Sequence, residues 1–188
     1  MAQLRIFVAF EISEELRSAG REIIRQLSEV ADDVRWVKPE NMHVTLKFLG
    51  EVEDRELHDV CRAVSGAVAG LSGFSLPCRS VGAFPNVKRP ATLWMGLDDP
   101  HNELRHLHGR IEESTAAIGF AQEHRPYRGH ITLGRIRSRR ENEPLSRMLT
   151  GLADRELADL SVNELVVFSS ELERGGPVYT AISRIPLK

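Results

Sequence analysis

Apolar residues along this chain recur at two spacings, at alternate positions in some segments and at every third or fourth position in others. Alternation and short apolar runs predict strands over residues 5–10, 34–37, 43–52, 74–84, 91–97, 130–137, 162–171 and 178–187. Helical spacing predicts helices over residues 13–30, 54–70, 100–118 and 144–152. Because strands and helices mix without strict alternation, we expect an α+β fold built on a largely antiparallel sheet.

The bulk composition is that of a globular protein. A chain of 188 residues with 41% hydrophobic and 28% charged residues can form one domain, or one domain of two similar lobes. No apolar stretch approaches the roughly 18 residues of a membrane helix, and a strand-like run follows Met1 almost directly, without a secretory signal. Cys61 and Cys78 lie in apolar surroundings without metal-ligand spacing, so we expect buried free thiols. These features predict a cytoplasmic protein that does not bind a membrane.

One short pattern occurs twice, at residues 38–46 and 125–133. Each copy reads basic residue, proline, three variable residues, histidine, β-branched aliphatic residue, threonine and leucine. The copies lie in the two halves of the chain, and each half carries a helix next to its motif strand. We therefore expect residues 1–188 to form a single bilobal domain, with two pseudo-symmetric lobes around a central cleft.

Each copy of the motif sorts its side chains by chemistry, because side chains alternate between the two faces of a strand. His43 and Thr45 share one face, while the aliphatic residues beside them point into the core. His130 and Thr132 share a face in the same way. A single His-x-Thr is more often an ordinary polar strand face than a site. Two matched copies predict a cleft that contains two imidazoles and two hydroxyls.

This set of groups suits the hydrolysis of a phosphodiester. One neutral histidine takes a proton from water, and one protonated histidine gives a proton to the departing oxygen. The threonine hydroxyls donate to the non-bridging phosphate oxygens, where negative charge concentrates, and a guanidinium adds a charge-assisted bond. The chemistry requires no metal, no cofactor and no serine or cysteine nucleophile.

Positive charge is concentrated around the second motif, although the net charge of the chain is −2. Residues 125–140 contain six arginines and no acid, which we interpret as a local anion-binding site rather than a surface for long duplex DNA. His101, His106 and His108 lack the i, i+4 spacing of a zinc-binding helix, so we expect solvated positions on the third helix. The chain has no glycine-rich phosphate loop and no nucleotidyl-transfer motif, which argues against an ATP-driven ligase.

The paired motifs resemble those of the two-histidine phosphoesterase superfamily, in particular its branch of 2'-5' RNA ligases and RNA 2',3'-cyclic phosphodiesterases. Residues 34–50 are similar to the most recognisable block of that branch, and residues 5–9 to its opening strand. Further similarities are found at residues 84–86, 89–94 and 176–179. The resemblance implies a two-lobed α+β fold with a V-shaped cleft, no metal, and hydrolysis of a 2',3'-cyclic phosphate to a 2'-phosphate.

The resemblance also implies roles for the motif residues. His43 is similar to the general acid that protonates the ribose O3', and His130 to the base that activates water. A pseudo-symmetric site permits the opposite assignment, so both remain open. Thr45 and Thr132 would hold the phosphate.

Arg135 matches a family arginine that contacts the phosphate, yet strict alternation would place it on the core side with Ile131 and Leu133. A β-bulge at Gly134 would turn it back toward the cleft. The chain departs from the family pattern at Gly129, where proline often precedes the second histidine. We expect this change to reduce rigidity and to leave the chemistry intact.

Three other functions remain open. Attack by an RNA 5'-hydroxyl instead of water would make the protein an ATP-independent 2'-5' RNA ligase. A non-catalytic RNA-end binding protein would keep the cleft, although binding alone would tolerate the loss of either imidazole. A phosphoesterase for small cyclic nucleotides, such as a cyclic phosphate of ADP-ribose, would need less basic surface. The expected partner is an RNA with a 2',3'-cyclic phosphate terminus, such as a tRNA half, or a small cyclic nucleotide, and we expect a monomer.

Overall fold

The computed structural model describes residues 3–138 and 140–188. Within these residues the chain forms nine strands: β1 (Gln3–Glu11), β2 (Val34–Trp36), β3 (His43–Glu53), β4 (Phe74–Phe84), β5 (Thr92–Leu97), β6 (His130–Ile136), β7 (Glu156–Val162), β8 (Glu164–Glu173) and β9 (Gly176–Pro186). Its α-helices there are α1 (Glu14–Ser28), α2 (Leu57–Val68), α3 (Glu103–Ala116) and α4 (Glu143–Gly151). Short 3-10 turns are found at Pro39–Asn41 and Asp54–Glu56. None of the helices in this part of the chain has the length and apolar content needed to cross a membrane.

Most elements lie where the apolar pattern places them, and local chemistry explains their ends. Ser13 caps α1 as predicted, because its hydroxyl accepts a hydrogen bond from a backbone N–H of the first turn. The third helix begins later than predicted, at Glu103, because Asn102 adopts a left-handed backbone with φ 58°. The apolar pattern does not predict β7, an edge strand in which only Leu160 and Val162 are buried.

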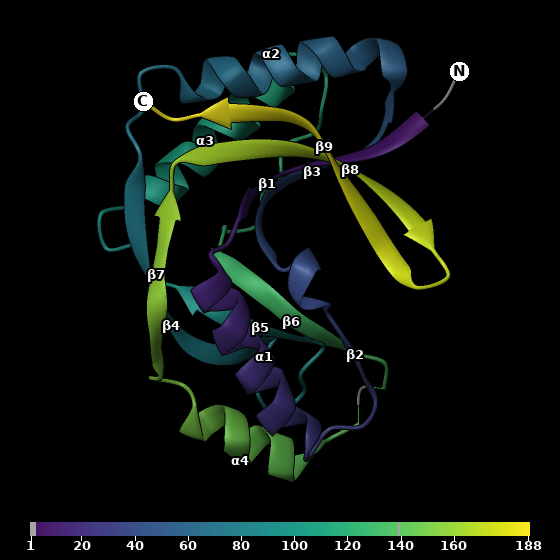
Figure 1. Cartoon of the computed structure of the whole chain (residues 1–188), viewed down its shortest axis with the longest axis vertical. Helices are drawn as coiled ribbons and strands as arrows, with labels where there is room; N and C mark the ends of the chain where they lie inside the picture. The colour runs from purple at the N-terminus through teal and green to yellow at the C-terminus, as the bar shows by residue number, and fades with distance from the viewer. Residues whose placement is uncertain (1–2, 139) are drawn as a thin grey trace.

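The strands form one antiparallel sheet in the order β7-β4-β5-β6-β3-β1-β8-β9, with β2 paired to β6. The sheet curls strongly, and its two halves face different helices (Figure 1). The halves join where β3 meets β6, at the pair Val44 and Ile131. The α+β prediction with an antiparallel sheet is confirmed. That residues 1–188 work as one bilobal domain stays a prediction.

The helices that precede the two motifs exchange places between the halves. Helix α1 precedes the first motif in sequence but packs against β6 and β7 of the other half. Helix α3 precedes the second motif and packs against β3 and α2 of the first half (Figure 1). Each motif strand therefore has a helix beside it, as predicted, but that helix comes from the other repeat.

The hydrophobic core lies on one face of the motif strands. The aliphatic residues of both motifs are each at most 3% exposed: Val44, Leu46, Ile131 and Leu133. This burial confirms the alternation predicted for the two motifs. A smaller apolar cluster lies on the opposite face of β1 and β8: Phe7, Ala9, Val166 and Phe168. Cys78 is buried as expected, whereas Cys61 is half-buried.

Candidate active site

The two histidine motifs meet at the junction of β3 and β6. Val44 of β3 lies opposite Ile131 of β6 in an antiparallel register. Extending this register by one residue in each direction places His43 beside Thr132 and Thr45 beside His130. The four side chains emerge on the face opposite the core, because the residues that alternate with them are buried. The structure thus brings together the two imidazoles and two hydroxyls that the repeat predicts.

The backbone orients both imidazoles in the same way. Nδ1 of His43 lies 2.8 Å from the carbonyl oxygen of Asn41, and Nδ1 of His130 lies 2.8 Å from that of Arg128. Because a carbonyl oxygen can only accept, each Nδ1 carries a proton and donates it. Each Nε2 is then the ring atom that can exchange a proton with a substrate. The acceptor lies two residues before the histidine in both motifs, so the variable part of the repeat supports the ring.

Aromatic rings pack against both imidazoles. The ring centroid of His43 lies 5.0 Å from that of Phe7 and 5.3 Å from that of Tyr179. The ring centroid of His130 lies 5.0 Å from that of Phe84, with the rings edge to face. These aromatic residues come from other strands, so no local pattern connects them with the histidines. In the sequence they stand out only as parts of the family resemblance.

Burial favours the neutral form of both imidazoles. Burial lowers the pKa of His43 below its usual 6.5; the hydrogen bond to Asn41 opposes the shift, and the charge of His130 adds to it. Burial also lowers the pKa of His130, against the bond to Arg128, and the charge of Arg135 lowers it further. An anionic substrate would stabilise the protonated forms and raise both pKa values again.

Each motif strand has a β-bulge directly after its threonine. In β3, Leu46 is the extra residue, because its two neighbours pair with two consecutive residues of β1. In β6, Leu133 is the extra residue, because its two neighbours pair with two consecutive residues of β5. An extra residue reverses the alternation beyond it. Arg135 is consequently exposed, as is Phe48 at the equivalent position of the first copy. The predicted bulge is confirmed, with the extra residue one position before Gly134.

The two bulges therefore give the two halves different chemistry at equivalent positions. The guanidinium of Arg135 lies 3.4 Å from the Thr92 hydroxyl, and its charge affects His130. Phe48 is 58% exposed, and its ring centroid lies 5.4 Å from that of Phe7. One half can thus supply a cation for a phosphate, and the other an aromatic surface for a base or ribose.

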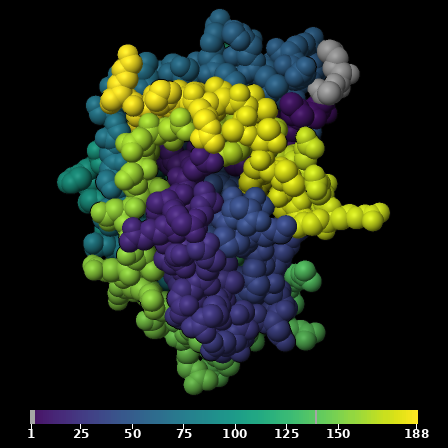
Figure 2. Space-filling model, in the orientation of Figure 1, coloured from purple at the N-terminus to yellow at the C-terminus, as the bar shows by residue number. Residues whose placement is uncertain are grey.

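Each histidine borders a pocket of its own. On the face drawn in Figure 2, the surface is hollowed where α1, the segment of residues 38–43 and β9 meet. This pocket, of about 320 Å³, is lined by His43, Arg17 and Tyr179 among others. A pocket of about 210 Å³ borders His130. The Thr45 hydroxyl lies 3.0 Å from Nε2 of His43, within reach of any group that this nitrogen binds.

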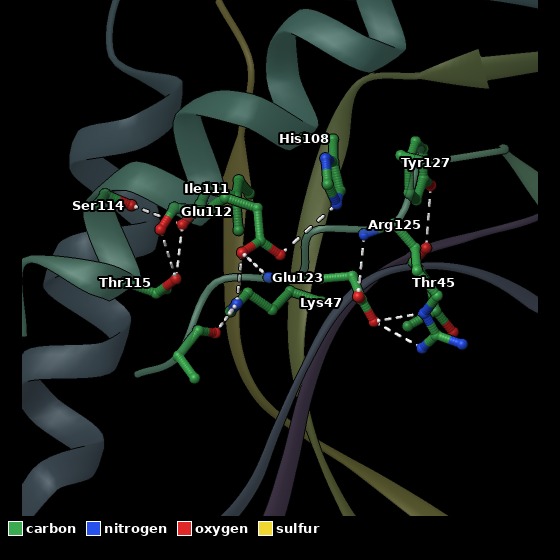
Figure 3. Close-up of polar contacts among 11 residues, drawn as sticks. Thr45, Lys47, His108, Ile111, Glu112, Ser114, Thr115, Glu123, Arg125 and Tyr127 are labelled. Carbon is green, nitrogen blue, oxygen red and sulfur yellow. Dashed lines mark hydrogen bonds and ion pairs between the residues drawn. The ribbon is translucent and has the colours of Figure 1, made fainter. Parts of the chain in front are cut away.

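A buried polar network supports the first motif from behind (Figure 3). The bulge turns Lys47 away from the cleft, and its Nζ lies 2.6 Å from a carboxylate oxygen of Glu112 in α3. Glu112 also contacts His108 at 3.5 Å, and His108 stacks on Tyr127 with ring centroids 4.1 Å apart. The Tyr127 hydroxyl donates to the backbone carbonyl of Thr45 at 2.9 Å. The network therefore links α3 and the loop before β6 to the backbone of the first motif.

The prediction of a solvated His108 is wrong. His108 is only 9% exposed, because it lies on the face of α3 that packs against β3. Its ring lies between Glu112 and Tyr127 (Figure 3). Burial lowers the pKa of His108, against the charge of Glu112. His101 and His106 are exposed, as predicted.

A curled antiparallel sheet that carries two adjacent His-x-Thr pairs on one face defines the class of two-histidine phosphoesterases. The sequence profile of the family described as LigT like Phosphoesterase matches residues 10–94 and again residues 96–179. Each match contains one copy of the motif, in agreement with the internal repeat. The chain belongs to the LigT-like phosphoesterase family.

Similar proteins match over nearly their whole length. A protein of Methanothermobacter thermautotrophicus named RNA 2',3'-cyclic phosphodiesterase is 31% identical over 95% of this chain and 96% of its own. A protein of the same name from Archaeoglobus fulgidus is 30% identical over 94% of this chain and 96% of its own. Among solved structures, E. coli LigT complexed with 3'-AMP has a TM-score of 0.78 at 24% identity, and the match covers 100% of this chain and 99% of that one.

Proposed function

We propose that this protein is a hydrolase that opens a 2',3'-cyclic phosphate at an RNA end to a 2'-phosphate, with His43 and His130 as general acid and base. The observation that carries the proposal is the matched orientation of the two rings. Each Nδ1 is bound to a backbone carbonyl, so each Nε2 is the ring nitrogen that exchanges a proton with the substrate, and that of His43 also contacts the Thr45 hydroxyl at 3.0 Å. The name carried by the curated relatives supports the substrate class.

In the proposed reaction, neutral His130 takes a proton from water while the water oxygen attacks phosphorus. The bond between phosphorus and O3' breaks, and protonated His43 gives its proton to O3'. One turnover therefore exchanges the protonation states of the two rings, and solvent resets them. Because the site is pseudo-symmetric, the assignment of acid and base stays a prediction.

The remaining groups of the cleft would bind the substrate. Thr45, Thr132 and Arg135 would donate hydrogen bonds to the non-bridging phosphate oxygens, where negative charge develops. The exposed ring of Phe48 beside Phe7 offers a surface for the base, since every base can stack on an aromatic ring. The E. coli LigT complex with 3'-AMP, a nucleotide with one base and one phosphate, supports a site of this size.

We propose hydrolysis rather than 2'-5' ligation as the reaction of this protein, because the curated relatives are named phosphodiesterases. The two reactions differ in the attacking oxygen, which comes from water in one case and from an RNA 5'-hydroxyl in the other. The same acid and base serve both. That the protein needs no cofactor, acts as a monomer and resides in the cytoplasm stays a prediction.

We expect the purified protein to hydrolyse an RNA that ends in a 2',3'-cyclic phosphate in the presence of excess EDTA, and to leave a 2'-phosphate. Histidine, threonine and arginine side chains supply all proton transfers and charge stabilisation in the proposed mechanism. The terminal phosphate is identified by ³¹P NMR, and a second RNA with a 5'-hydroxyl reveals any joining. Activity lost in EDTA and restored by zinc or manganese would contradict the mechanism. A 3'-phosphate product would show that the ribose binds the other way round.

The dependence of kcat/KM on pH should be a bell with its midpoint below pH 6.5. This parameter reports the free enzyme, in which burial lowers the pKa values of both His43 and His130. Both limbs of the bell therefore lie at lower pH than two histidines with the usual pKa would give, and the two titrations are coupled. The bell for kcat should lie at higher pH, because the bound phosphate stabilises the imidazolium. Rates at low and saturating substrate from pH 4 to 9 test this expectation, which a single sigmoid or a kcat/KM midpoint above 6.5 would refute.

A further inference from the structure

Strands β2 and β6 place two arginines directly opposite each other. Arg35 of β2 pairs with Arg135 of β6 in the antiparallel register, and both residues are exposed. Like charges at opposite positions destabilise a sheet. Among the ion pairs formed within residues 3–138 and 140–188, none includes either arginine. An anion bound between the two guanidinium groups would remove this repulsion.

The pair lies beyond the catalytic histidines along β6. Arg135 follows His130 by five residues, which at about 3.3 Å per strand residue corresponds to roughly 16 Å between the two backbones. Nη1 of Arg135 lies 3.4 Å from the Thr92 hydroxyl of β5, and its charge is among the causes that lower the pKa of His130. Arg35 stands on β2, on the opposite side of β6 from Thr92. A ligand that fills the site and continues along β6 with a second nucleotide would reach Arg35.

The tip of the β8–β9 hairpin lies beside the side chains of Arg35 and Lys38. A Cβ added to Gly176, which has a φ of 114°, would lie 3.9 Å from Nη2 of Arg35. A Cβ added to Gly175 would lie 3.7 Å from Nζ of Lys38. The hairpin tip thus presents bare backbone to a guanidinium and an ammonium group, and leaves both free of side-chain cover from these two positions.

Tyr179 connects this basic surface with the catalytic site. Its ring packs edge to face on His43, with the centroids 5.3 Å apart. Burial raises the pKa of Tyr179, and the charges of Arg135 and Arg35 act against that rise. Gly176, whose added Cβ would lie 3.9 Å from Nη2 of Arg35, precedes Tyr179 by three residues in β9. This strand therefore runs from the arginine pair to a ring that touches a catalytic histidine, which is the arrangement required for a ligand that spans both.

We propose that Arg35, with Lys38 beside it, binds the internucleotide phosphate next to the cyclic end while Arg135 opposite it binds the cyclic phosphate, so that the protein prefers an RNA chain to a nucleoside 2',3'-cyclic phosphate. This inference rests on the proposed function and names the substrate class of the same site. The planar fork of arginine matches two phosphate oxygens at once. A nucleoside cyclic phosphate has no second phosphate and cannot use Arg35.

The test compares kcat/KM for a dinucleotide RNA that ends in a 2',3'-cyclic phosphate with kcat/KM for the corresponding nucleoside cyclic phosphate. Arg35→Gln should lower the ratio of the two values roughly five- to tenfold, because one charge-assisted contact at an exposed site is lost. It should also weaken the decrease of kcat/KM with salt for the dinucleotide, because one screened charge contact is lost. Arg35→Lys keeps the charge without the fork and should give an intermediate ratio. Arg62→Gln removes an exposed arginine from α2 and is the matched control, with an unchanged ratio.

Different failures have different meanings in this experiment. An unchanged ratio in Arg35→Gln, or equal losses on both substrates at an unchanged melting temperature, would overturn the phosphate subsite. Wild-type protein that hydrolyses neither substrate would overturn the proposed function instead. A cyclic phosphate of ADP-ribose, which carries a diphosphate, serves as a third substrate. If Arg35→Gln reduces turnover of this compound and spares the dinucleotide, Arg35 serves a small nucleotide and the RNA assignment is wrong.

Discussion

Alanine at His43 or at His130 should reduce kcat/KM on a cyclic-phosphate RNA by at least about 10²–10⁴-fold, the usual contribution of one general acid or base. Both rings are fixed through Nδ1 on the same face of the sheet, and each borders its own pocket, so neither can replace the other in its own proton transfer. Steady-state rates of the two variants, measured alongside their thermal unfolding, test the prediction. Both proteins should stay folded, because the core is formed by the alternating aliphatic residues.

The double variant should be scarcely slower than either single variant, because groups that act as a unit are strongly non-additive. Binding of the cyclic phosphate should persist in all three, since Thr45, Thr132 and Arg135 remain. His106→Ala is the matched control, as this exposed histidine of α3 should have no role in turnover. Near-normal turnover in either single variant would exclude the two-histidine mechanism and favour a non-catalytic RNA-end binding protein.

Replacing Lys47 by methionine should lower the free energy of unfolding by about 3–5 kcal/mol, the usual effect of breaking a buried ion pair from one side. The Lys47 and Glu112 side chains are 3% and 9% exposed, so the variant would leave a buried carboxylate without its cation. The combined Lys47→Met and Glu112→Leu variant should regain most of the loss, because an apolar pair of similar volume is often tolerated. A residual deficit is expected, since the Ala121 carbonyl and the Glu123 N–H lose their partners.

Urea denaturation of the three proteins measures these differences. Arg147→Met is the control, because it breaks an ion pair with Glu143 that lies on the surface and should contribute little. A Lys47→Met protein as stable as the wild type would show that Glu112 is neutralised or solvated in another way. The network would then not be the support of the Thr45 backbone that its geometry indicates.

The sequence by itself determined the parts of this protein that depend on residues close together in the chain. Side-chain alternation needs only positions two apart, so each His-x-Thr pair and its buried aliphatic neighbours could be assigned without a structure. The cap of α1 at Ser13 depends on the first turn of one helix and was equally readable. The repeat of the motif was also readable, and the two matches to one family profile bear it out.

Only the tertiary structure decided what lies beyond the threonines. A β-bulge is defined by the pairing of a strand with its neighbour, so alternation alone placed Arg135 on the core side, and only the family resemblance suggested otherwise. The positions of Phe48 and Lys47 could not be predicted either. The burial of His108 depends on which face of α3 docks on a strand from the other repeat. The opposition of Arg35 and Arg135 likewise arises from two strands about a hundred residues apart in the chain. Contacts of this kind are set by long-range packing, which no pattern of neighbouring residues encodes.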